Sequence, residues 1–402
     1  MRVLLAFDKF KGAIPAREAC GVAAEALASG GGGWSSDQCP LTDGGEGFAE
    51  ILTSAAGGKL HTLRVAGPRG ARVTAHYGLV RVDQIPGAAR VMLDLRHLQK
   101  TAIVAVIEMA QASGLALLPE NRRDPWATST RGTGRIFEAA IAAGAQGILL
   151  GVGGSATHDL GLGALSALGF KFRRGDGRVL RAVEPTKWPA LARVTAPPRA
   201  SFPPIWIACD VTNPLLGPRG AAKIYGPQKG LRSQDFARLE HETVRMAAIL
   251  RAHSKQPRSM EQFPGAGAAG GLAFGLMCVL RAKMLPGFDL ITAWLGLERR
   301  MKAADMIITG EGRFDESSFN GKGPGSVVER GLQLRKAVHV FTGRTTPMPL
   351  RKGLQIHVIT PRGQKLAQAL RDTGRNLALS VRETFAVPAE LREASSRIPR
   401  AP

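Results

Sequence analysis

The segment "GILLGVGGSATHDLGLGAL", residues 147–165, connects an apolar, strand-like run to a helix-like run through a turn rich in glycine. Helical spacing resumes at Leu162, so the turn lies between a strand and a helix. It carries Ser155, Thr157 and Asp159 among its glycines. Such turns present unpaired N–H groups and the positive end of a helix dipole, which together favour an anion. The segment therefore predicts an anion site or, in the simpler interpretation, close backbone packing alone.

Two better-known phosphate motifs do not account for this turn. Gly151, Gly153 and Ala156 match a relaxed dinucleotide-binding spacing, but the next acid falls in the turn-like sequence "RRGDGR" rather than after a strand. Neither Gly-Lys pair of the chain is followed by serine or threonine, which excludes a Walker lysine motif. A third stretch, "PGAGAAGG", contains Gly265 and Gly267 but follows no strand, so helix packing and phosphate contact are both open.

The composition is that of a globular, strongly basic protein. With 402 residues, of which 44% are hydrophobic, the chain is long enough for two domains. The net charge of +22 is compatible with nucleic-acid binding, but the basic residues are spread out and only 5% of residues are aromatic. We therefore favour a solvated basic surface, whose positive field also suits small anions, and expect no nucleic-acid partner.

The sequence also bears on location. No apolar run is long enough to span a bilayer, and the first strand-like run meets Asp8 too soon for a signal peptide. The four cysteines are scattered without metal-type spacing, as expected of reduced thiols. The sequence therefore predicts a cytoplasmic protein without a membrane partner. A homo-oligomer is left open, because no pattern indicates the oligomeric state.

Short β-rich runs alternate with alanine-rich helical segments, which predicts an α/β fold. The expected strands span residues 2–7, 103–107, 147–152, 205–209, 306–309, 338–342 and 356–360, and the expected helices span residues 16–28, 134–143, 234–252 and 366–384. Residues 63–80 alternate around "GPRG" and predict a β-hairpin, which interrupts the strand–helix rhythm. We therefore expect a discontinuous Rossmann-like domain of residues 1–64 and 290–402, with residues 65–289 inserted as a second α/β domain.

Acidic and basic side chains follow several of the expected strands or lie in glycine-rich turns. They are Asp8, Lys9 and Lys11 after the first strand, Asp43 and Glu46 in "CPLTDGGEG", Asp210 and Asn213 after "IWIAC", and Glu311, Arg313 and Asp315 in "ITGEGRFD", with Lys322 just beyond. Ligands of α/β proteins bind outside the carboxyl ends of strands. A single acid there is commonly a helix cap or turn former. Several carboxylates with lysines, and no Cys/His cluster, are typical of phosphoryl transfer.

Nine blocks of the chain, within residues 1–345, resemble in order the signature blocks of bacterial glycerate 2-kinases. They are "AFDKFKGA", "LTDGGEG", "VAGPRG", "IEMAQASGLALLP", "RDPWATSTRGTG", "GVGGSATHDLGLG", "ACDVTNPLLGPRGAAKIYGPQKG", "PGAGAAGG" and "ADMIITGEGRFDESSFNGKGP". The resemblance implies ATP- and Mg²⁺-dependent phosphorylation of D-glycerate at its 2-hydroxyl, which gives 2-phosphoglycerate and ADP. It also implies two α/β domains, one of them discontinuous, with the active site in the cleft between them.

The matching positions, combined with their chemistry, give each candidate residue an expected role. Asp210 is the expected base for the glycerate 2-hydroxyl, with Asp43 as runner-up, and Lys9 or Lys11 is expected to neutralise phosphate. Arg313 is expected to bind the substrate carboxylate through two hydrogen bonds. The residues expected to contact the nucleotide or its phosphates are Gly153, Gly154, Ser155, Ala156, Thr157, Gly265, Gly267 and Lys322. Those expected to contact the substrate are Asp8, Glu46, Asn213 and Arg313. The expected Mg²⁺ ligands are Glu311, Asp315 and Asp159.

Two departures from the family pattern bear on these roles. Lys9 replaces the usual serine of the first block, and His158 stands where the family commonly has asparagine before the loop aspartate. Two alternatives to D-glycerate phosphorylation follow. One is a kinase of the same fold that acts on another small hydroxy acid, and the other is a basic binding protein without catalysis.

Overall fold

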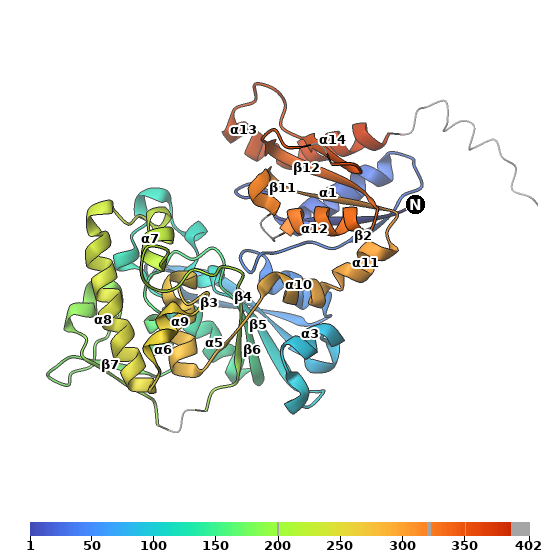
Figure 1. Cartoon of the computed structure of the whole chain (residues 1–402). Coiled ribbons are helices and arrows are strands. Elements are labelled where there is room, and N and C mark those ends of the chain that lie inside the picture. Colours follow the sequence, from blue (N-terminus) through green and yellow to red (C-terminus); the bar gives the residue numbers. More distant parts are fainter. Residues whose placement is uncertain (199–200, 320–322, 350, 387–402) are drawn as a thin grey trace, which may run out of the picture. The chain divides into compact units, whose positions relative to one another are not determined.

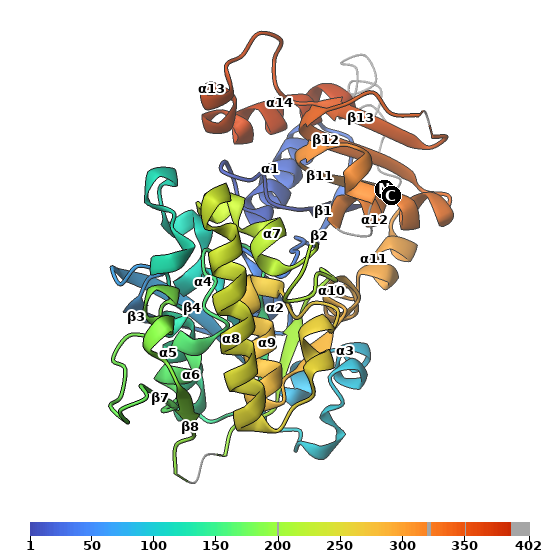
Figure 2. The same cartoon turned by 60° about the vertical axis from the view of Figure 1, so that its left-hand side comes forward.

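The structure is a computed structural model that describes residues 1–198, 201–319, 323–349 and 351–386 (Figure 1). The chain divides into two compact units. The first unit combines Met1–Thr42 with the part of the chain that begins at Leu295, and the second unit is Asp43–Trp294. Each unit contains a large sheet of its own, and helices flank both sheets (Figures 1 and 2).

The first unit is built on a five-stranded parallel sheet in the order β13-β12-β11-β1-β2. Its strands are β1 (Arg2–Phe7), β2 (Ser35–Gln38), β11 (Met306–Phe314), β12 (Ala337–Thr345) and β13 (Leu354–Val358), and its helices are α1 (Ala16–Ser29), α11 (Leu297–Ala303), α12 (Gly323–Gln333), α13 (Leu366–Arg371) and α14 (Thr373–Phe385). Successive side chains of a strand point to opposite faces. Val3, Leu5 and Phe7 therefore face the same way and form a buried cluster with apolar residues of α1 and α14.

The second unit is built on a six-stranded mixed sheet in the order β10-β9-β6-β5-β4-β3. Its strands are β3 (Lys59–Ala66), β4 (Arg72–Arg81), β5 (Ile103–Glu108), β6 (Ala145–Gly151), β9 (Ile205–Ala208) and β10 (Lys283–Leu285), and a separate two-stranded sheet pairs β7 (Lys171–Arg173) with β8 (Arg193–Thr195). Its helices are α2 (Phe48–Ala55), α3 (Gly87–Met92), α4 (Ala110–Ser113), α5 (Arg131–Ala142), α6 (Leu162–Ala167), α7 (Ala221–Tyr225), α8 (Phe236–Ser254), α9 (Ala268–Leu280) and α10 (Gly287–Leu295). Strands β5, β6, β9 and β10 run parallel, so their carboxyl ends share one edge.

The predicted elements are present, and two of them differ most in extent. The strand expected over residues 306–309 continues as β11 to Phe314, so Glu311 and Arg313 lie within it. The hairpin predicted over residues 63–80 is confirmed as the antiparallel pair β3 and β4. Residues 366–384, expected as one helix, form α13 and α14, which meet at Asp372. The Asp372 carboxylate accepts hydrogen bonds from the side chains of Gln364 (2.8 Å) and Gln368 (2.6 Å), which ties it to the preceding turns.

The division between the units differs from the expected boundary after residue 64. That position lies inside β3, which is hydrogen-bonded along its length to β4 in the second sheet. The first unit therefore ends earlier, at Thr42, and resumes at Leu295. Strand pairing, rather than the start of the alternating pattern, determines where the second unit begins.

Two further features follow from the described part of the chain. No helix there is both long enough and apolar enough to cross a membrane. The four cysteines are free thiols, as the sequence predicts.

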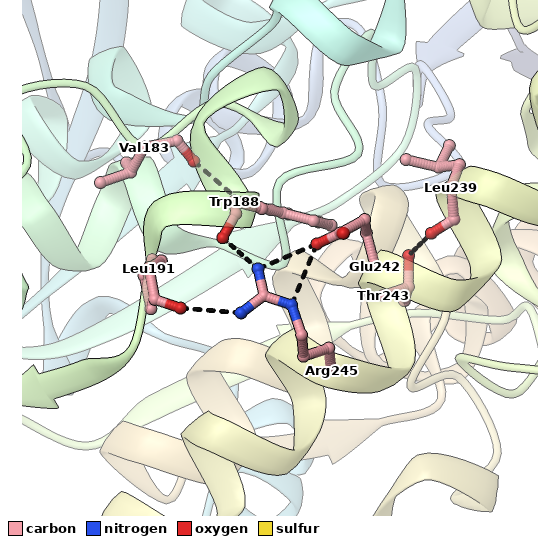
Figure 3. A network of polar contacts seen from close by, with 7 residues as sticks. All are labelled: Val183, Trp188, Leu191, Leu239, Glu242, Thr243 and Arg245. Atoms are coloured by element: carbon pink, nitrogen blue, oxygen red, sulfur yellow. Dashed lines mark hydrogen bonds and ion pairs between the residues drawn. The ribbon is translucent and has the colours of Figure 1, made fainter. Parts of the chain in front are cut away.

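A polar network fixes helix α8 to the segment that precedes β8 (Figure 3). The Arg245 guanidinium donates to the carbonyl of Leu191 (2.8 Å) and to the carbonyl of Trp188, and it also pairs with Glu242 on its own helix (2.9 Å). The Trp188 ring is fully buried, and its Nε1 donates to the carbonyl of Val183 (3.1 Å). Arginine thus satisfies carbonyls of a segment that lies outside the main sheet.

Gly275→Ala is expected to destabilise the second unit, because a Cβ there would lie 1.9 Å from the carbonyl oxygen of Leu160. Such overpacking costs about 1–3 kcal/mol. Gly21→Ala in α1 is the matched control, since a Cβ there meets nothing within 4 Å. Alanine inside a helix is favoured over glycine by about 0.5–1 kcal/mol. Thermal unfolding followed by circular dichroism separates the two variants, and equal melting temperatures would contradict the packing described.

Candidate active site

The loop after β6, residues 152–161, packs against the loop of residues 43–47 without side chains between the two backbones. The Gly153 N–H donates to the carbonyl of Gly44 (3.0 Å). A Cβ at Gly153 would lie 2.7 Å from the 43–47 backbone, and a Cβ at Gly151 would lie 2.4 Å from the Gly44 oxygen. Only glycine fits so close an approach. Backbone packing therefore accounts for Gly151 and Gly153.

The next residues of the loop leave backbone donors available. Gly154 adopts a left-handed conformation with φ of +70°. The N–H groups of Gly154, Ser155 and Thr157 make no hydrogen bond to any residue in the described part of the chain. Successive unpaired N–H groups around a left-handed residue are a geometry that suits an anion. Ala156 differs, because its N–H donates to the carbonyl of Ser113 (2.9 Å).

These two observations refine the expected phosphate cradle of residues 153–157. The N–H groups of Gly153 and Ala156 donate to carbonyls of the chain itself, and a phosphate contact by these two residues stays a prediction. The other three N–H groups remain candidates for that contact. The two interpretations of the loop, backbone packing and anion binding, thus apply to different residues of the same turn.

Asp159 anchors this loop from a fully buried position. Its Oδ2 accepts the N–H (2.7 Å) and the hydroxyl (2.9 Å) of Thr130 and the N–H of Gly163 (3.2 Å), and its Oδ1 accepts the N–H of Gly161 (3.1 Å). Burial raises the pKa of Asp159, and these donors oppose the rise. Both oxygens accept hydrogen bonds from the chain, and the expected Mg²⁺ ligation by Asp159 stays a prediction.

His158, which departs from the family pattern, is buried against α8. Its Nε2 lies 3.1 Å from the Thr243 hydroxyl, and that hydroxyl donates to the carbonyl of Leu239 (2.7 Å). The hydroxyl therefore accepts a hydrogen bond from Nε2–H. Burial lowers the pKa of His158 to about 3, so the imidazole is neutral at neutral pH. The substitution supplies a neutral donor and adds no charge near pH 7.

Sequence reasoning missed Lys229, which lies in "GPQKG" beyond α7. The residue is buried, and its Nζ donates to Ser155 Oγ (2.8 Å) and to the carbonyl of Thr157 (2.7 Å). Burial lowers the pKa of Lys229 to about 7, and the charge of Asp159 opposes that shift. Lysine and loop are more than 70 residues apart in the chain, so no local pattern connects them. The available signal was that both lie in blocks of the family resemblance.

Asp210 and Asn213 follow β9, next to β6 in the sheet. Both carboxylate oxygens of Asp210 lie close to the N–H of Phe288, at 3.0 and 3.1 Å, near the start of α10. This contact is the helix-capping role that an acid after a strand often has. The Asn213 side chain donates to the carbonyl of Arg219 (2.9 Å) and accepts from the Tyr225 hydroxyl (2.6 Å). Asn213 thus shapes its own loop, and its contact with substrate stays a prediction.

The 43–47 loop brings further carboxylates to the same sheet edge. Asp43 and Glu46 are exposed there. Sequence reasoning missed Glu108, at the end of β5, which is 1% exposed and whose Oε2 has no hydrogen-bond partner among the described residues. Burial raises the pKa of Glu108 to about 7, and the charge of Glu46 acts in the same direction. The structure thus places the ends of β5, β6 and β9 around one loop.

The glycines of "PGAGAAGG" pack against neighbouring backbone and side chains. The Gly267 N–H donates to the carbonyl of Asn213 (3.0 Å), and a Cβ at Gly267 would lie 2.3 Å from the Pro214 oxygen. Gly265 has φ of +86°, and a Cβ there would lie 2.5 Å from Met284 Cε. Packing therefore explains both glycines, and a nucleotide contact by either stays a prediction.

The first unit gathers a second charged group where β1 ends beside the later part of β11, which runs on to Phe314. Phe7 of β1 pairs with Gly310 of β11, so Asp8 and Glu311 follow neighbouring positions of parallel strands. The Lys9 ammonium lies 3.8 Å from Asp8 Oδ1. Asp8, Lys9 and Glu311 are half-buried. Neighbouring parallel strands thus deliver two carboxylates and an ammonium to one place.

The rest of this group lies on the segment that follows Glu311. The Arg313 Nε lies 2.7 Å from Asp315 Oδ2, and Arg313 is exposed. Lys11 is also exposed. Lys322, an expected phosphate contact, lies outside the described residues. The ion pair with Asp315 occupies the guanidinium that was expected to bind the substrate carboxylate, and that binding stays a prediction.

Glu311 carries the strongest electrostatic perturbation of the first unit's group. Burial raises its pKa to about 7, and repulsion from Asp8 and Asp315 acts in the same direction. A hydrogen bond with Ser318 and the charge of Lys9 oppose the rise. Its buried Oε1 has no hydrogen-bond partner in the described part of the chain.

The repulsion among the carboxylates of this group favours a bound cation. No group of three or more His, Cys, Asp or Glu within the described ranges is arranged to hold a metal ion. Mg²⁺ usually keeps several waters and takes one or two protein carboxylates. Glu311 with Asp8 or Asp315 meets that need, because a cation relieves their mutual repulsion.

Comparison with known proteins agrees with this chemistry. The family model for the glycerate kinase family matches residues 3–388. A glycerate kinase of Bacillus cereus is 33% identical, over 96% of this chain and 98% of its own length, and a glycerate 2-kinase of Escherichia coli is 34% identical, over 86% of each chain. A crystal structure described as a glycerate kinase 2 from Salmonella typhimurium LT2 matches with a TM-score of 0.73 at 32% identity, over 98% of this chain and 99% of the other.

The relatives and the matching crystal structure are glycerate kinases, which places the chain among the phosphotransferases. The length and the sequence identity of these matches are sufficient to assign the family. The chain belongs to the glycerate kinase family.

Glu311→Gln tests the electrostatics of the first unit. The folded-state pKa of about 7 lies above the value of about 4.3 for an unfolded glutamate, so the stability that Glu311 contributes below pH 4.3 is lost as pH rises through 7. Glutamine does not ionise. The variant should therefore become more stable relative to the natural protein between pH 5 and pH 8, as measured by urea unfolding.

The matched control is Glu316→Gln, at an exposed position of the same segment. Its difference from the natural protein should stay the same at both pH values. A pH-independent difference for Glu311→Gln as well would show that the Glu311 carboxylate ionises normally in the folded protein.

Proposed function

We propose that the protein transfers the γ-phosphoryl group of ATP to the 2-hydroxyl of D-glycerate, which gives 2-phosphoglycerate and ADP. Membership of the glycerate kinase family supports the substrate and the reaction class. The observation that carries the proposal is the 152–161 loop, where unpaired N–H groups lie beside a buried lysine. Backbone donors and a lysine are the groups that stabilise charge in phosphoryl transfer.

The proposed roles follow from where each group lies. The N–H groups of Gly154, Ser155 and Thr157 bind phosphate oxygens. Asp210, at the end of β9, accepts the proton of the substrate hydroxyl as its oxygen attacks phosphorus, and Asp43 is the alternative base. The bond from phosphorus to the bridging oxygen of ATP breaks as the new bond forms, and ADP carries away the leaving oxygen.

The first unit's group has its own proposed part. Glu311, with Asp8 or Asp315, would hold Mg²⁺, which would supply positive charge to the phosphate oxygens. Lys9 and Lys11 add positive charge near the nucleotide phosphates. Arg313 binds the carboxylate of glycerate, which requires it to exchange its ion pair with Asp315 for one with the substrate.

A coupled assay with ATP, Mg²⁺ and D-glycerate tests the reaction. Enzymes specific for 2- or 3-phosphoglycerate distinguish the two products, and formation of 2-phosphoglycerate is expected. Consumption of ATP with another hydroxy acid alone would leave a kinase with a different substrate. Salt-sensitive DNA binding without ATP turnover would favour the basic binding protein that the net charge of +22 allows.

Asp210→Asn is expected to lower kcat by about 10²–10⁴-fold, the usual contribution of a general base. Asparagine keeps an oxygen that accepts the Phe288 N–H, so the contact with α10 and the melting temperature should be retained. Asp210→Ala removes both functions and should lower stability as well. Near-normal turnover of Asp210→Asn, with the fold intact, would leave Asp210 as a helix cap and transfer the base role to Asp43.

A further inference from the structure

Lys229 places a positive charge in the interior without a carboxylate to balance it. It is 1% exposed. Its two hydrogen-bond acceptors are neutral, and no carboxylate in the described ranges lies within 4.0 Å of its Nζ. The nearest acidic residue along the loop, Asp159, directs its oxygens to Thr130 and to backbone N–H groups instead. A buried ammonium without a counter-ion is costly, so this arrangement needs an explanation.

The surroundings of Lys229 are held in place. The Lys229 N–H donates to the carbonyl of Gly226 (2.9 Å). Gly230 has φ of +90°, and a Cβ there would lie 2.3 Å from the carbonyl of Arg123. These contacts fix the backbone from which the lysine side chain extends to the loop.

The loop carries unsatisfied groups close to this charge. The Thr157 hydroxyl is buried and has no hydrogen-bond partner among the described residues, although the carbonyl of the same residue accepts from Lys229. The N–H groups of Gly154, Ser155 and Thr157 are also unpaired within the described part of the chain. A bound anion would accept hydrogen bonds from these unpaired donors and would also balance the charge of the ammonium.

We propose that Lys229 is the positioning residue of the phosphate site: its ammonium holds Ser155 and Thr157 in place and supplies the charge that balances an anion bound to the loop. The proposal deepens the proposed function and rests on it for the identity of the anion, a phosphoryl group. Lys229 acts through the loop, because its buried Nζ bonds to Ser155 and Thr157 rather than facing solvent. The positive charge of Lys229 has the same electrostatic function as the lysine of a Walker motif in other phosphate sites.

The charge state of Lys229 gives this role a pH signature. Burial lowers its pKa to about 7 in the free protein, and an anion on the loop raises the pKa again because it favours the ammonium. Anion affinity is therefore highest below pH 7 and falls as the lysine loses its proton above pH 7. His158 lies beside it with a pKa lowered to about 3 by burial, and so stays neutral over this range. The other charged neighbours are Asp159 on the loop and Arg123 beside Gly230.

Sulfate is the appropriate probe, because it carries the same charge throughout this pH range whereas phosphate titrates near pH 7. Sulfate affinity of the full chain is measured from the rise in unfolding temperature with sulfate concentration, at pH 6 and pH 8.5. The variants are Lys229→Met, which keeps the side-chain length without the charge, Lys229→Arg, which keeps a charge, and Lys171→Met as the control at an exposed position.

The natural protein and the control should lose affinity for sulfate by about tenfold or more between the two pH values. Lys229→Met should bind sulfate about tenfold more weakly at pH 6 and show no such pH dependence. Lys229→Arg should recover part of the affinity at pH 6 and keep it at pH 8.5, because arginine stays charged. A structural role alone would not give these pH profiles.

The possible results distinguish a failure of the role proposed for Lys229 from a failure of the proposed function. Unchanged sulfate affinity and an unchanged pH profile in a folded Lys229→Met variant would overturn the role of Lys229, even if D-glycerate is phosphorylated. Lysine-dependent sulfate binding in a protein that does not phosphorylate D-glycerate would support the anion site and overturn the substrate instead. In the active enzyme, Lys229→Met should also raise the KM for ATP, and an unaltered KM and kcat would contradict the proposal.

Discussion

The buried carboxylate of Asp159 is the constraint on which the geometry of the second unit's loop depends. Its two oxygens accept four hydrogen bonds, from Thr130 at the start of α5 and from the backbone of residues 161 and 163. A buried carboxylate is stable only when such donors surround it. The loop, α5 and α6 are therefore locked together, and residues 154–157 are held in a turn in which the N–H groups of Gly154, Ser155 and Thr157 make no hydrogen bond to described residues. An acid at this position builds the site.

Glycines allow other segments of the second unit to pack closely against the same loop. Gly151 and Gly153 allow the 43–47 loop to lie directly against the 152–161 loop, and Gly270 and Gly275 allow α9 to approach residues 157–160. Each of these positions would place a Cβ between about 2 and 3 Å from neighbouring backbone atoms. Glycine richness in this chain thus serves backbone contact as much as ligand contact, and the two functions fall on different residues.

Each unit contains a buried group whose pKa is shifted by its surroundings, and the two groups favour ligands of opposite charge. In the first, burial and neighbouring carboxylates raise the pKa of Glu311, so that the group is stabilised by a cation. In the second, burial lowers the pKa of Lys229, so that the group is stabilised by an anion. Perturbed groups of this kind commonly mark functional sites. Each of the two groups is consistent with a phosphotransferase of the glycerate kinase family.

The sequence by itself determined most of the strands of the two large sheets, the hairpin, the strand-to-helix turn and the family, because periodicity and motif order are local properties of the chain. It also drew attention to Asp8, Glu311 and Asp210, since polar residues that follow an apolar run can be recognised without a structure. The tertiary structure decided the rest. Lys229 meets Thr157 across more than 70 residues, and Glu108 meets the start of α2 across about 60, so only folding brings them together. Tertiary contacts also make Asp159 an anchor of the loop, because its burial and its hydrogen bonds with Thr130 depend on residues that no local pattern connects to it.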